Sequence, residues 1–432
     1  MAVHTLIGPP TQNPLPMSAP TVASTAELLT PTSTVAPSPA RTRERLVSLD
    51  VFRGLTIAGM LLVNNPGDWG HIYPPLEHAT WNGWTPTDLI FPFFLFIVGI
   101  TTHLSLSSRR ARGATDGDIL RQIFKRGGMI VLIGLLLSGI PFHEFEFTLG
   151  PLAFSSVHPA LGLHDWRFTG VLQRIGVVYI VAALLTLRTT LKQQIGILAA
   201  LLLGYWFAMT LIPVPGHGLG MHNLNDASAT LGAFIDRAIF GTNHLWKGSV
   251  TWDPEGIFST IPAVGTAILG VMTGRWISSP RPLLDRIAAL FAAGAMAMVV
   301  GLIWNWVFPI NKSLWTSSYV LFTAGVACVT LATCMWLIDV KRVSWGVKPL
   351  VVFGLNPLFA FVGEGFIGRL LQTLFKVNYA GQPVSLQVGI DRALFGSWLS
   401  PVNASLAFAI CFVAVFYAMM WELARRNIVF KV

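Results

Sequence analysis

Titratable side chains gather in the segments between apolar runs, and the densest group lies between residues 63 and 88. His78 stands there beside the acidic Glu77 and a Trp-rich stretch, and Asp88 opens the next apolar run. A neutral imidazole in these surroundings accepts a proton and serves as a general base. The alternative for His78 is packing or solvation, which the residues alone favour, and Asp88 is then simply an acid at the positive end of a helix.

Two further charged residues, Arg174 and Glu364, fall inside apolar runs. An ionised group within a membrane span is costly and usually faces a partner or a cavity. Gln173 precedes Arg174, Arg167 stands just before the same run, and Asn356 lies eight positions before Glu364. Pairing of Arg174 with an acidic side chain and contact with a substrate both remain open.

Polar motifs also precede two later apolar runs. Asp253 and Glu255 flank a proline immediately before one of them, a pattern typical of a helix cap. Lys312 is the solitary lysine of a short polar loop before the other. Neither motif by itself decides between a structural and a catalytic role.

Three classes of site do not fit the sequence. His71, His78 and Asp68 lack the i, i+4 helical pairing that would make a zinc site specific, so we expect no metal. A Walker A loop and a G-x-S-x-G elbow are both missing, which argues against an ATPase and an α/β-hydrolase. The three cysteines lie in apolar runs without metal-ligand spacing: Cys328, Cys334 and Cys411.

The elements that must position these residues are membrane helices. Charged residues make up 11% of the 432 residues and hydrophobic residues 53%, whereas soluble domains are roughly a quarter charged. We therefore predict an all-α, polytopic integral membrane protein of about ten transmembrane helices, each needing about 20 residues to cross the bilayer. The predicted spans are residues 52–66, 87–107, 124–140, 169–187, 195–212, 257–277, 286–308, 317–338, 349–374 and 405–423.

Basic residues predict the orientation of these spans. Of the 29 Lys and Arg residues, 21 lie in segments on the N-terminal side of the membrane, six on the opposite side, and two inside spans. This asymmetry predicts that both termini are cytoplasmic. Basic loops beside a membrane also account for the net charge of +9 without nucleic acid. Residues 1–45, rich in Pro, Thr and Ser, predict a disordered cytoplasmic tail before a transmembrane domain of residues 46–432.

A series of motifs resembles the heparan-α-glucosaminide N-acetyltransferase family and its bacterial members. The motifs occur in the family's order over about residues 46–432. They are SLDVFRG at 48–54, VN at 63–64, HATWNG at 78–83, DLIFP at 88–92, GVLQRIG at 170–176, DPEG at 253–256, NKSLWTSSY at 311–319 and GLNPL at 354–358.

The resemblance implies transfer of an acetyl group from cytosolic acetyl-CoA to the amino group of a glucosamine on the other side of the membrane. It implies that His78 is the catalytic histidine, as base or as nucleophile, and that Asn64 is a functional neighbour. Asn64 or Asn82 would orient His78 or donate to the oxyanion, and Arg167 or Arg174 would contact CoA phosphates or an acceptor carboxylate. The candidate substrate- or cofactor-binding residues are Asn82, Asp88, Arg167, Gln173, Arg174, Asp253, Glu255, Lys312, Asn356 and Glu364.

The resemblance also implies the partners and the location. We expect acetyl-CoA as co-substrate with no permanently bound cofactor, an amino-sugar acceptor, the lipid bilayer of a bacterial inner membrane, and no nucleic acid, with a homodimer left open. A polar tail stands where the lysosomal enzyme has a lumenal domain, which leaves the natural acceptor open. Two alternatives remain: a sugar or glycan transporter lined by Arg174 and Glu364, and an O-acetyltransferase of an envelope polysaccharide.

Overall fold

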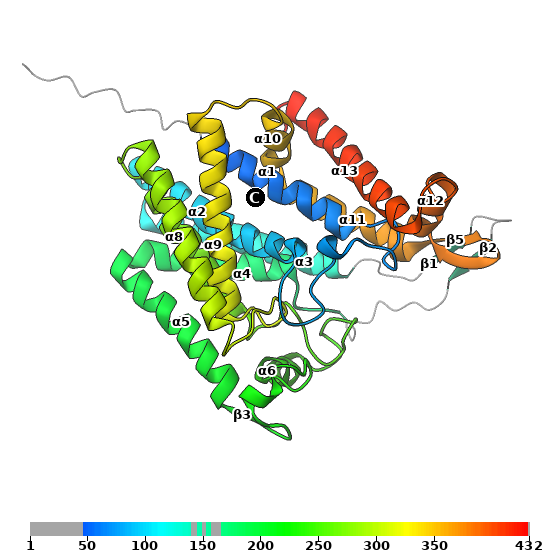
Figure 1. The fold of residues 1–432 in the computed structure, drawn as a ribbon, viewed down its shortest axis with the longest axis horizontal. Coiled ribbons are helices and arrows are strands. Elements are labelled where there is room, and N and C mark those ends of the chain that lie inside the picture. The colour runs from blue at the N-terminus through cyan, green and yellow to red at the C-terminus, as the bar shows by residue number, and fades with distance from the viewer. Residues whose placement is uncertain (1–45, 140–144, 149–152, 157–165, 431–432) are drawn as a thin grey trace, which may run out of the picture. The chain divides into compact units, whose positions relative to one another are not determined.

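The computed structural model describes residues 46–139, 145–148, 153–156 and 166–430, and the predicted tail of residues 1–45 lies outside them. Helices dominate this part of the chain (Figure 1), which confirms the predicted polytopic helical class. The α-helices are α1 Val47–Asn64, α2 Ile90–Ala111, α3 Asp116–Ser138, α4 Val171–Arg188, α5 Leu191–Leu211, α6 Leu231–Phe240, α7 Thr260–Ile277, α8 Leu283–Trp304, α9 Ser317–Cys334, α10 Val347–Leu355, α11 Pro357–Arg369, α12 Leu386–Leu394 and α13 Pro401–Arg425.

Each predicted span coincides with a helix or with the pair α10–α11. Among the described residues, seven helices are long and apolar enough to cross a membrane, or eight if the bent pair counts as one span. α3 and α7 occupy the two remaining predicted positions but are not among these helices. The chain is therefore a multi-pass membrane protein.

The predicted span 349–374 is not one straight helix. α10 and the helical stretch that starts at Pro357 are bent by 79° from each other. Pro357 has no N–H to continue the ladder, and its ring forces Asn356 out of the helical region, to φ −127° and ψ 58°. The Asn356 side chain then donates to the carbonyl of Ile428 at 3.0 Å and accepts from the amide of Phe430 at 2.8 Å. The break thus anchors the C-terminal segment.

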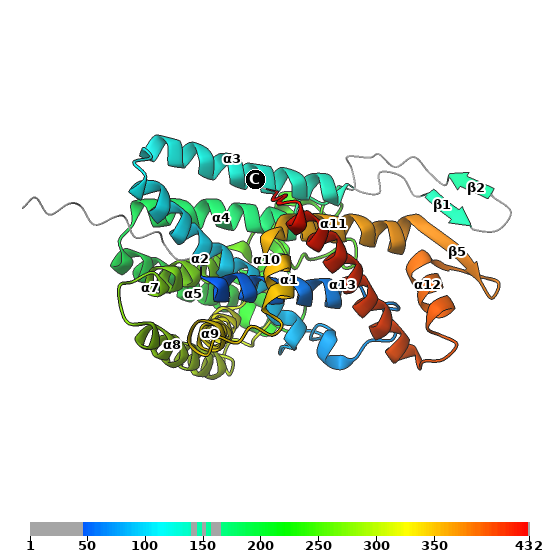
Figure 2. The ribbon, with the colours of Figure 1, turned by 90° about the horizontal axis from the view of Figure 1, so that it is seen from above.

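Small residues let the central helices approach closely. A Cβ atom added to Gly99 of α2 would lie 2.0 Å from the carbonyl oxygen of Ala267 in α7, and one at Gly270 would lie 2.1 Å from that of Phe96. Backbone contact of this kind is how helices associate in lipid, where apolar burial gives no driving force. α8 and α9 also lie side by side, as both views show (Figures 1 and 2).

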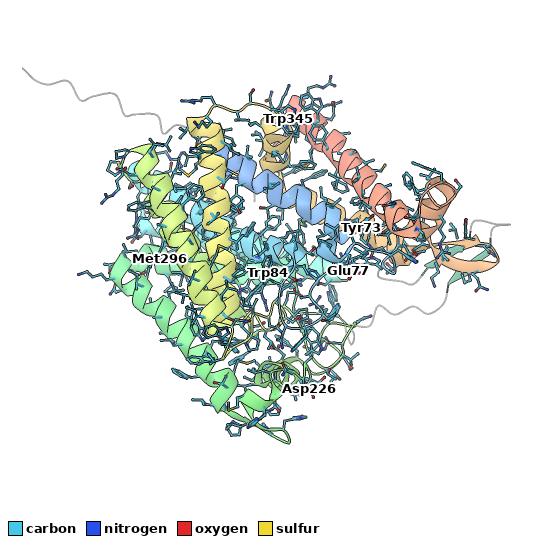
Figure 3. The ribbon with its side chains drawn as sticks, viewed as in Figure 1. Tyr73, Glu77, Trp84, Asp226, Met296 and Trp345 are labelled. Carbon is cyan, nitrogen blue, oxygen red and sulfur yellow. The ribbon has the colours of Figure 1, made fainter. Side chains whose placement is uncertain are left out.

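An outward apolar face marks the surface that meets lipid. Met296 is 68% exposed, and Val299 and Ile303 on the same helix, α8, are also exposed. Figure 3 labels Met296, and Figure 2 shows its helix, α8, along one side of the helical assembly. Such a continuous apolar surface would be unfavourable in water and suits the hydrocarbon of a bilayer.

A small sheet, which the all-α prediction did not include, lies beyond the end of α11. Its strand order is β2-β1-β5-β6, with β1 and β5 parallel and the other neighbours antiparallel. Ala380 and Gly381 both have positive φ in the two-residue turn between β5 and β6, as a type I′ hairpin requires. The strands are β1 Phe145–Thr148, β2 Ala153–Ser156, β5 Phe375–Tyr379 and β6 Gln382–Ser385, with a separate hairpin of β3 Pro213–Val214 and β4 Gly218–Leu219.

Candidate active site

His78 pairs with Asp88 at the start of the α2 region. The Nδ1 atom of His78 lies 2.7 Å from Oδ1 of Asp88, whose other oxygen accepts from the amides of Ala79 and Thr85, each at 3.0 Å. Asp88 is 1% exposed, whereas 48% of the His78 side chain is exposed. A buried carboxylate therefore holds the Nδ1 edge of the ring, while the rest of the side chain stays partly exposed to solvent. Asp88 also closes a capping box with Thr85, so the predicted role at a helix start accompanies the contact with His78.

Lys312 lies within reach of both nitrogens of the same ring. Its Nζ atom is 3.0 Å from Nε2 of His78 and 3.3 Å from Nδ1. Because the Asp88 carboxylate can only accept when ionised, we assign the ring proton to Nδ1 and the lone pair to Nε2. Burial lowers the pKa of the Lys312 amine, while Glu255 and Asp88 attract its charge and act to raise that pKa.

Asn82 and Asn311 support the loop that carries Lys312. The Asn311 amide group donates to Oδ1 of Asn82 at 3.2 Å, and Oδ1 of Asn311 accepts from the amide of Leu314 at 2.9 Å. Asn82 in turn donates to Asn225 at 2.7 Å. Asn82 therefore contacts the loop of Lys312 directly, through Asn311.

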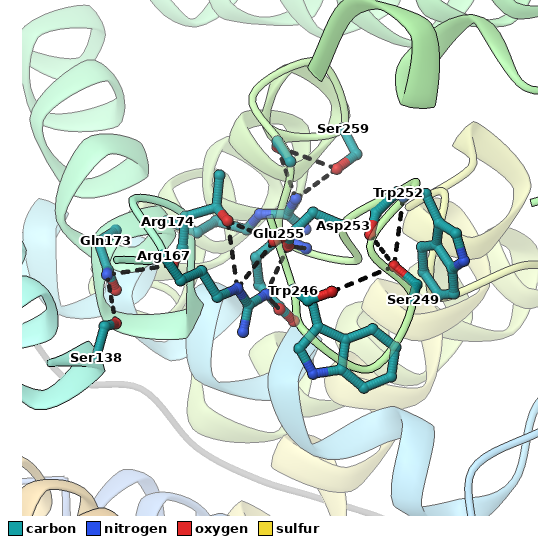
Figure 4. A network of polar contacts seen from close by, with 12 residues as sticks. Ser138, Arg167, Gln173, Arg174, Trp246, Ser249, Trp252, Asp253, Glu255 and Ser259 are labelled. Atoms are coloured by element: carbon teal, nitrogen blue, oxygen red, sulfur yellow. Dashed lines mark hydrogen bonds and ion pairs between the residues drawn. The ribbon is translucent and has the colours of Figure 1, made fainter. Parts of the chain in front are cut away.

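Arg167 joins the start of α4 to the segment before α7 (Figure 4). Its Nε and Nη2 atoms donate to the two oxygens of Asp253 at 2.8 and 2.5 Å, and Nη2 also lies 2.7 Å from Glu255. Burial alone would raise the pKa of Asp253, but hydrogen bonds and charge from Arg167 outweigh burial and hold it below its ordinary value. The Thr169 hydroxyl donates to the same carboxylate at 2.5 Å.

The predicted cap by Asp253 and Glu255 is not what begins α7. The helix starts at Thr260, and Asp236 of α6 instead accepts hydrogen bonds from the amides of Ile257 and Phe258, at 2.9 and 3.4 Å. Because Asp253 and Glu255 form ion pairs with Arg167, the amides of Ile257 and Phe258 are instead satisfied by Asp236, which belongs to α6. Sequence reasoning missed Asp236, because 20 positions separate it from Gly256, the residue that packs against it.

Arg174 is buried below this network. Its Nη2 atom donates to the carbonyl of Gly256 at 2.9 Å and to the hydroxyl of Ser259, and its guanidinium lies 5.2 Å from the Trp315 ring centroid. In the part of the chain that the structure describes, its Nε and Nη1 atoms have no hydrogen-bond partner. The observed contacts are those of a structural residue, with two donors left unpaired.

A cavity of about 380 Å³ opens beside Arg167. We call it the α1–α11 cavity, because its wall comes from the ends of α1 and α3, the start of α4 and the length of α11. Four predicted site residues line it: Asn64, Arg167, Gln173 and Glu364. Gln173 donates to Ser138 of α3 at 3.0 Å, a contact that Figure 4 also shows.

Glu364 ties α11 to the end of α1. The Asn65 side chain donates to Oε1 of Glu364 at 3.3 Å, and the Asn64 side chain also hydrogen bonds to this carboxylate. Asn65, a partner of Glu364, and Trp69, which lines the cavity, were missed from the sequence. Both lie within five positions after Asn64, so the Asn64 motif was the signal that could have pointed to them.

The predicted residues thus fall into connected groups at one end of the helices. Lys312 contacts His78, and the charge of Glu255, an ion-pair partner of Arg167, acts to raise the pKa of the Lys312 amine. Asn356 lies apart and holds the C-terminal segment. Among residues 46–139 and 166–430, no three His, Cys, Asp or Glu side chains are close enough to bind a metal ion.

Comparisons with known proteins agree on one family. The family model described as heparan-alpha-glucosaminide N-acetyltransferase, catalytic, matches residues 45–303. The human heparan-alpha-glucosaminide N-acetyltransferase is 32% identical, over 74% of this chain and 52% of its own. The mouse protein of the same name is 31% identical, over 74% and 53%. The chain therefore spans about half the length of these relatives.

Proposed function

The chain belongs to the heparan-alpha-glucosaminide N-acetyltransferase family, and from this premise we propose that it transfers an acetyl group from acetyl-CoA to the amino group of a glucosamine-type sugar. The observation that carries the proposal is the pairing of accessible His78 with buried Asp88 at 2.7 Å. Amine acylation requires a base that a carboxylate holds in place and whose second nitrogen keeps a lone pair to accept a proton.

The proposed reaction places each proton on a named group. The acceptor nitrogen attacks the carbonyl carbon of the thioester and gives its proton to Nε2 of His78. The carbon–sulfur bond then breaks, and the proton passes from the imidazolium to the departing CoA thiolate. Asp88 stabilises the imidazolium through the Nδ1 proton, and the Lys312 ammonium stabilises the oxyanion that forms on the carbonyl.

The sidedness of the reaction is part of the proposal. We place the donor in the cytosol and the acceptor on the opposite side of a bacterial inner membrane, because His78 precedes a helix start on the side with few basic residues. The acetyl group, rather than the whole of CoA, would then cross the bilayer.

Replacement of His78 tests this function. We expect His78→Ala to lower acetyl transfer from labelled acetyl-CoA to glucosamine by about 10²–10⁴-fold, the usual contribution of a general base. His71→Ala is the matched control, since His71 is an exposed histidine of the same loop that pairs with Asp68 at 3.2 Å. Near-normal transfer by His78→Ala would refute the assignment.

A covalent route is distinguished by trapping. Protein given labelled acetyl-CoA without acceptor should retain label on His78 if the imidazole is a nucleophile, and none if it is a base. In the nucleophile case, the loss in His78→Ala should exceed the range above.

A second candidate function is transport of a sugar. The 79° break between α10 and α11, followed by the buried acid Glu364, resembles the broken helices that form transporter sites. Vesicles given labelled acetyl-CoA and glucosamine separate the two functions. A transporter accumulates unmodified glucosamine, whereas an acetyltransferase forms N-acetylglucosamine.

A further inference from the structure

We infer that α12 and the turn that follows α1 form a binding site for a calcium ion, with the Asp391 carboxylate and the Gln387 amide oxygen as protein ligands. Neither residue lines the α1–α11 cavity, and the site does not depend on the proposed acetyl transfer. Figures 1 and 2 both show α12 beside the start of α13. α12 is not among the helices long and apolar enough to cross a membrane, so the site belongs to the part outside the spans.

The turn at residues 65–68 is held in place by two helices. The Gln387 side chain of α12 donates to the carbonyl of Pro66. The Ser405 hydroxyl of α13 accepts from the amide of Asp68 at 3.1 Å and donates to its carbonyl, also at 3.1 Å. The backbone of this turn therefore forms a fixed wall against α12.

Two buried oxygens of α12 meet this wall without a donor. Asp391 is 4% exposed and Gln387 is 2% exposed. Within the part of the chain that the structure describes, neither Oδ1 of Asp391 nor Oε1 of Gln387 has a hydrogen-bond partner. The two residues are four positions apart, so their side chains lie on one face of the helix. A Cβ atom added to Gly67 would lie 2.3 Å from Oδ1 of Asp391, which shows that the carboxylate lies directly against the turn.

The charge of Asp391 is not balanced by a neighbour. Burial raises the pKa of this carboxyl and the charge of Asp68 raises it further, whereas Arg392 and His71 act to lower it. These two cations pair with Asp68 instead, at 3.7 and 3.2 Å. Among the described residues, no Lys, Arg or His nitrogen forms an ion pair with Asp391. A buried carboxylate without a partner is costly, and a bound cation would supply the missing charge.

The types of ligand indicate calcium. Carboxylate and amide oxygens bind calcium, whereas zinc and copper favour imidazole or thiolate. Calcium also accepts six to eight oxygens in flexible geometry, so backbone carbonyls and water can complete its shell, while magnesium demands a near-ideal octahedron. The site departs from the expectation of no metal drawn from the sequence, because its two walls lie 321 positions apart.

Calcium binding to the full chain in detergent tests the inference. The protein is first treated with a chelator and placed in sodium-free buffer, and calcium is then compared with magnesium and sodium by calorimetric titration and by thermal midpoint. We expect a single calcium ion to bind with a Kd of about 10⁻⁴–10⁻³ M, the range of extracellular calcium modules. Calcium should raise the thermal midpoint more than the other two ions do, because a ligand that binds only the folded chain stabilises it.

Variants of the two ligands assign this binding to the site. Asp391→Asn keeps the shape of the side chain but removes its charge, so calcium affinity should fall by about 10–100-fold. Gln387→Met keeps the length of the side chain but removes its oxygen, and it should also weaken binding. Asp226→Asn is the matched control, since Asp226 is an exposed aspartate between α5 and α6, labelled in Figure 3, and it should bind calcium as wild type does.

The order of stabilities provides a second readout. Without calcium, Asp391→Asn should melt at or above the midpoint of wild type, because the variant removes an unpaired buried charge. At saturating calcium, wild type should be the more stable of the two. An ordered water that satisfies the same oxygens would give no response to calcium and would overturn the inference. An equal response in Asp391→Asn and wild type, or an equal response to all three ions, would overturn it as well. None of these measurements uses acetyl transfer, so a failure of the proposed function would leave the test unaffected.

Discussion

The Asp88 carboxylate contacts both the His78 ring and the backbone of the loop that carries it. One of its oxygens faces the His78 ring, and the other accepts from the amides of Ala79 and Thr85, so the same carboxylate shapes the loop and orients the base. The Tyr319 hydroxyl donates to the backbone carbonyl of Asp88 at 2.5 Å and fixes its position from α9. Orientation of the histidine is thus built into the turn that carries it.

Replacing this carboxylate should separate chemistry from folding. We expect Asp88→Asn to lower kcat by roughly 10²–10³-fold, because an amide does not stabilise the imidazolium and permits the wrong ring tautomer. The KM for glucosamine should change little. Asp116→Asn, which changes an exposed aspartate at the start of α3, is the control. A kcat within about threefold of wild type, in folded protein, would contradict the role of Asp88.

The sequence could propose the site residues one by one but could not assemble them. His78 was singled out by its loop and by the resemblance, yet its contact with Lys312 spans 234 positions and has no local signature. The partners of Arg167 lie 86 and 88 positions away. Position along the chain and the family resemblance therefore predicted which side chains were candidates, while only the packing of helices shows which of them meet.

At the scale of elements, long apolar helices were predictable and breaks were not. Each apolar run coincides with a helix or with the pair α10–α11, and among the described residues seven of these helices, or eight with the bent pair, are long and apolar enough to cross a membrane. The bend at Pro357 lay within one such run and was missed, although proline was its visible cause. The small sheet was missed as well, since strands of four or five residues carry little periodic signal.

The crossing of α2 and α7 makes a prediction about glycine. Gly99→Ala should destabilise the protein by about 1–3 kcal/mol, because its Cβ atom would meet backbone and force the helices apart. Gly204→Ala in α5 is the matched control, since nothing lies within 4 Å of its added Cβ atom. Thermal midpoints in one detergent check both variants. Equal midpoints for Gly99→Ala and wild type would mean that this contact is not tight.

The segment before α7 should make stability depend on pH. Burial raises the pKa of Asp236 to about 6, against the hydrogen bonds from Phe258 and Ile257 that act to lower it. Its stabilising contribution is therefore complete below its ordinary pKa of 3.8 and is lost as the pH rises through about 6. Asp236→Asn keeps the acceptor oxygen but does not titrate. Its thermal midpoint should therefore not show this pH-dependent loss of stability, which is worth up to about 3 kcal/mol in wild type. The same change of thermal midpoint with pH in the variant and in wild type would contradict this.

For the whole molecule, the contacts define two ends. At one end, the starts of α2, α4 and the segments before α7 and α9 come together around His78, Arg167 and Lys312. At the other, the end of α2 meets the ends of α4 and α7, where Arg110 donates to the carbonyl of Leu187 and His103 lies 3.4 Å from Ser278. The last turns of these three helices carry basic residues at this second end: Arg109 and Arg110 in α2, Arg188 in α4 and Arg275 in α7.

Cysteine labelling determines which end faces the cytoplasm. In a protein whose three native cysteines are replaced by serine, we expect Arg112→Cys to react with an impermeant maleimide only in inside-out vesicles. Thr242→Cys should react only in right-side-out vesicles. Both positions are exposed, Arg112 between α2 and α3 and Thr242 after α6, so accessibility reports the side and not burial. The opposite pattern would place His78 in the cytoplasm with the donor. The pairing with Asp88 would then still serve acetyl transfer, but the acetyl group would have no membrane to cross.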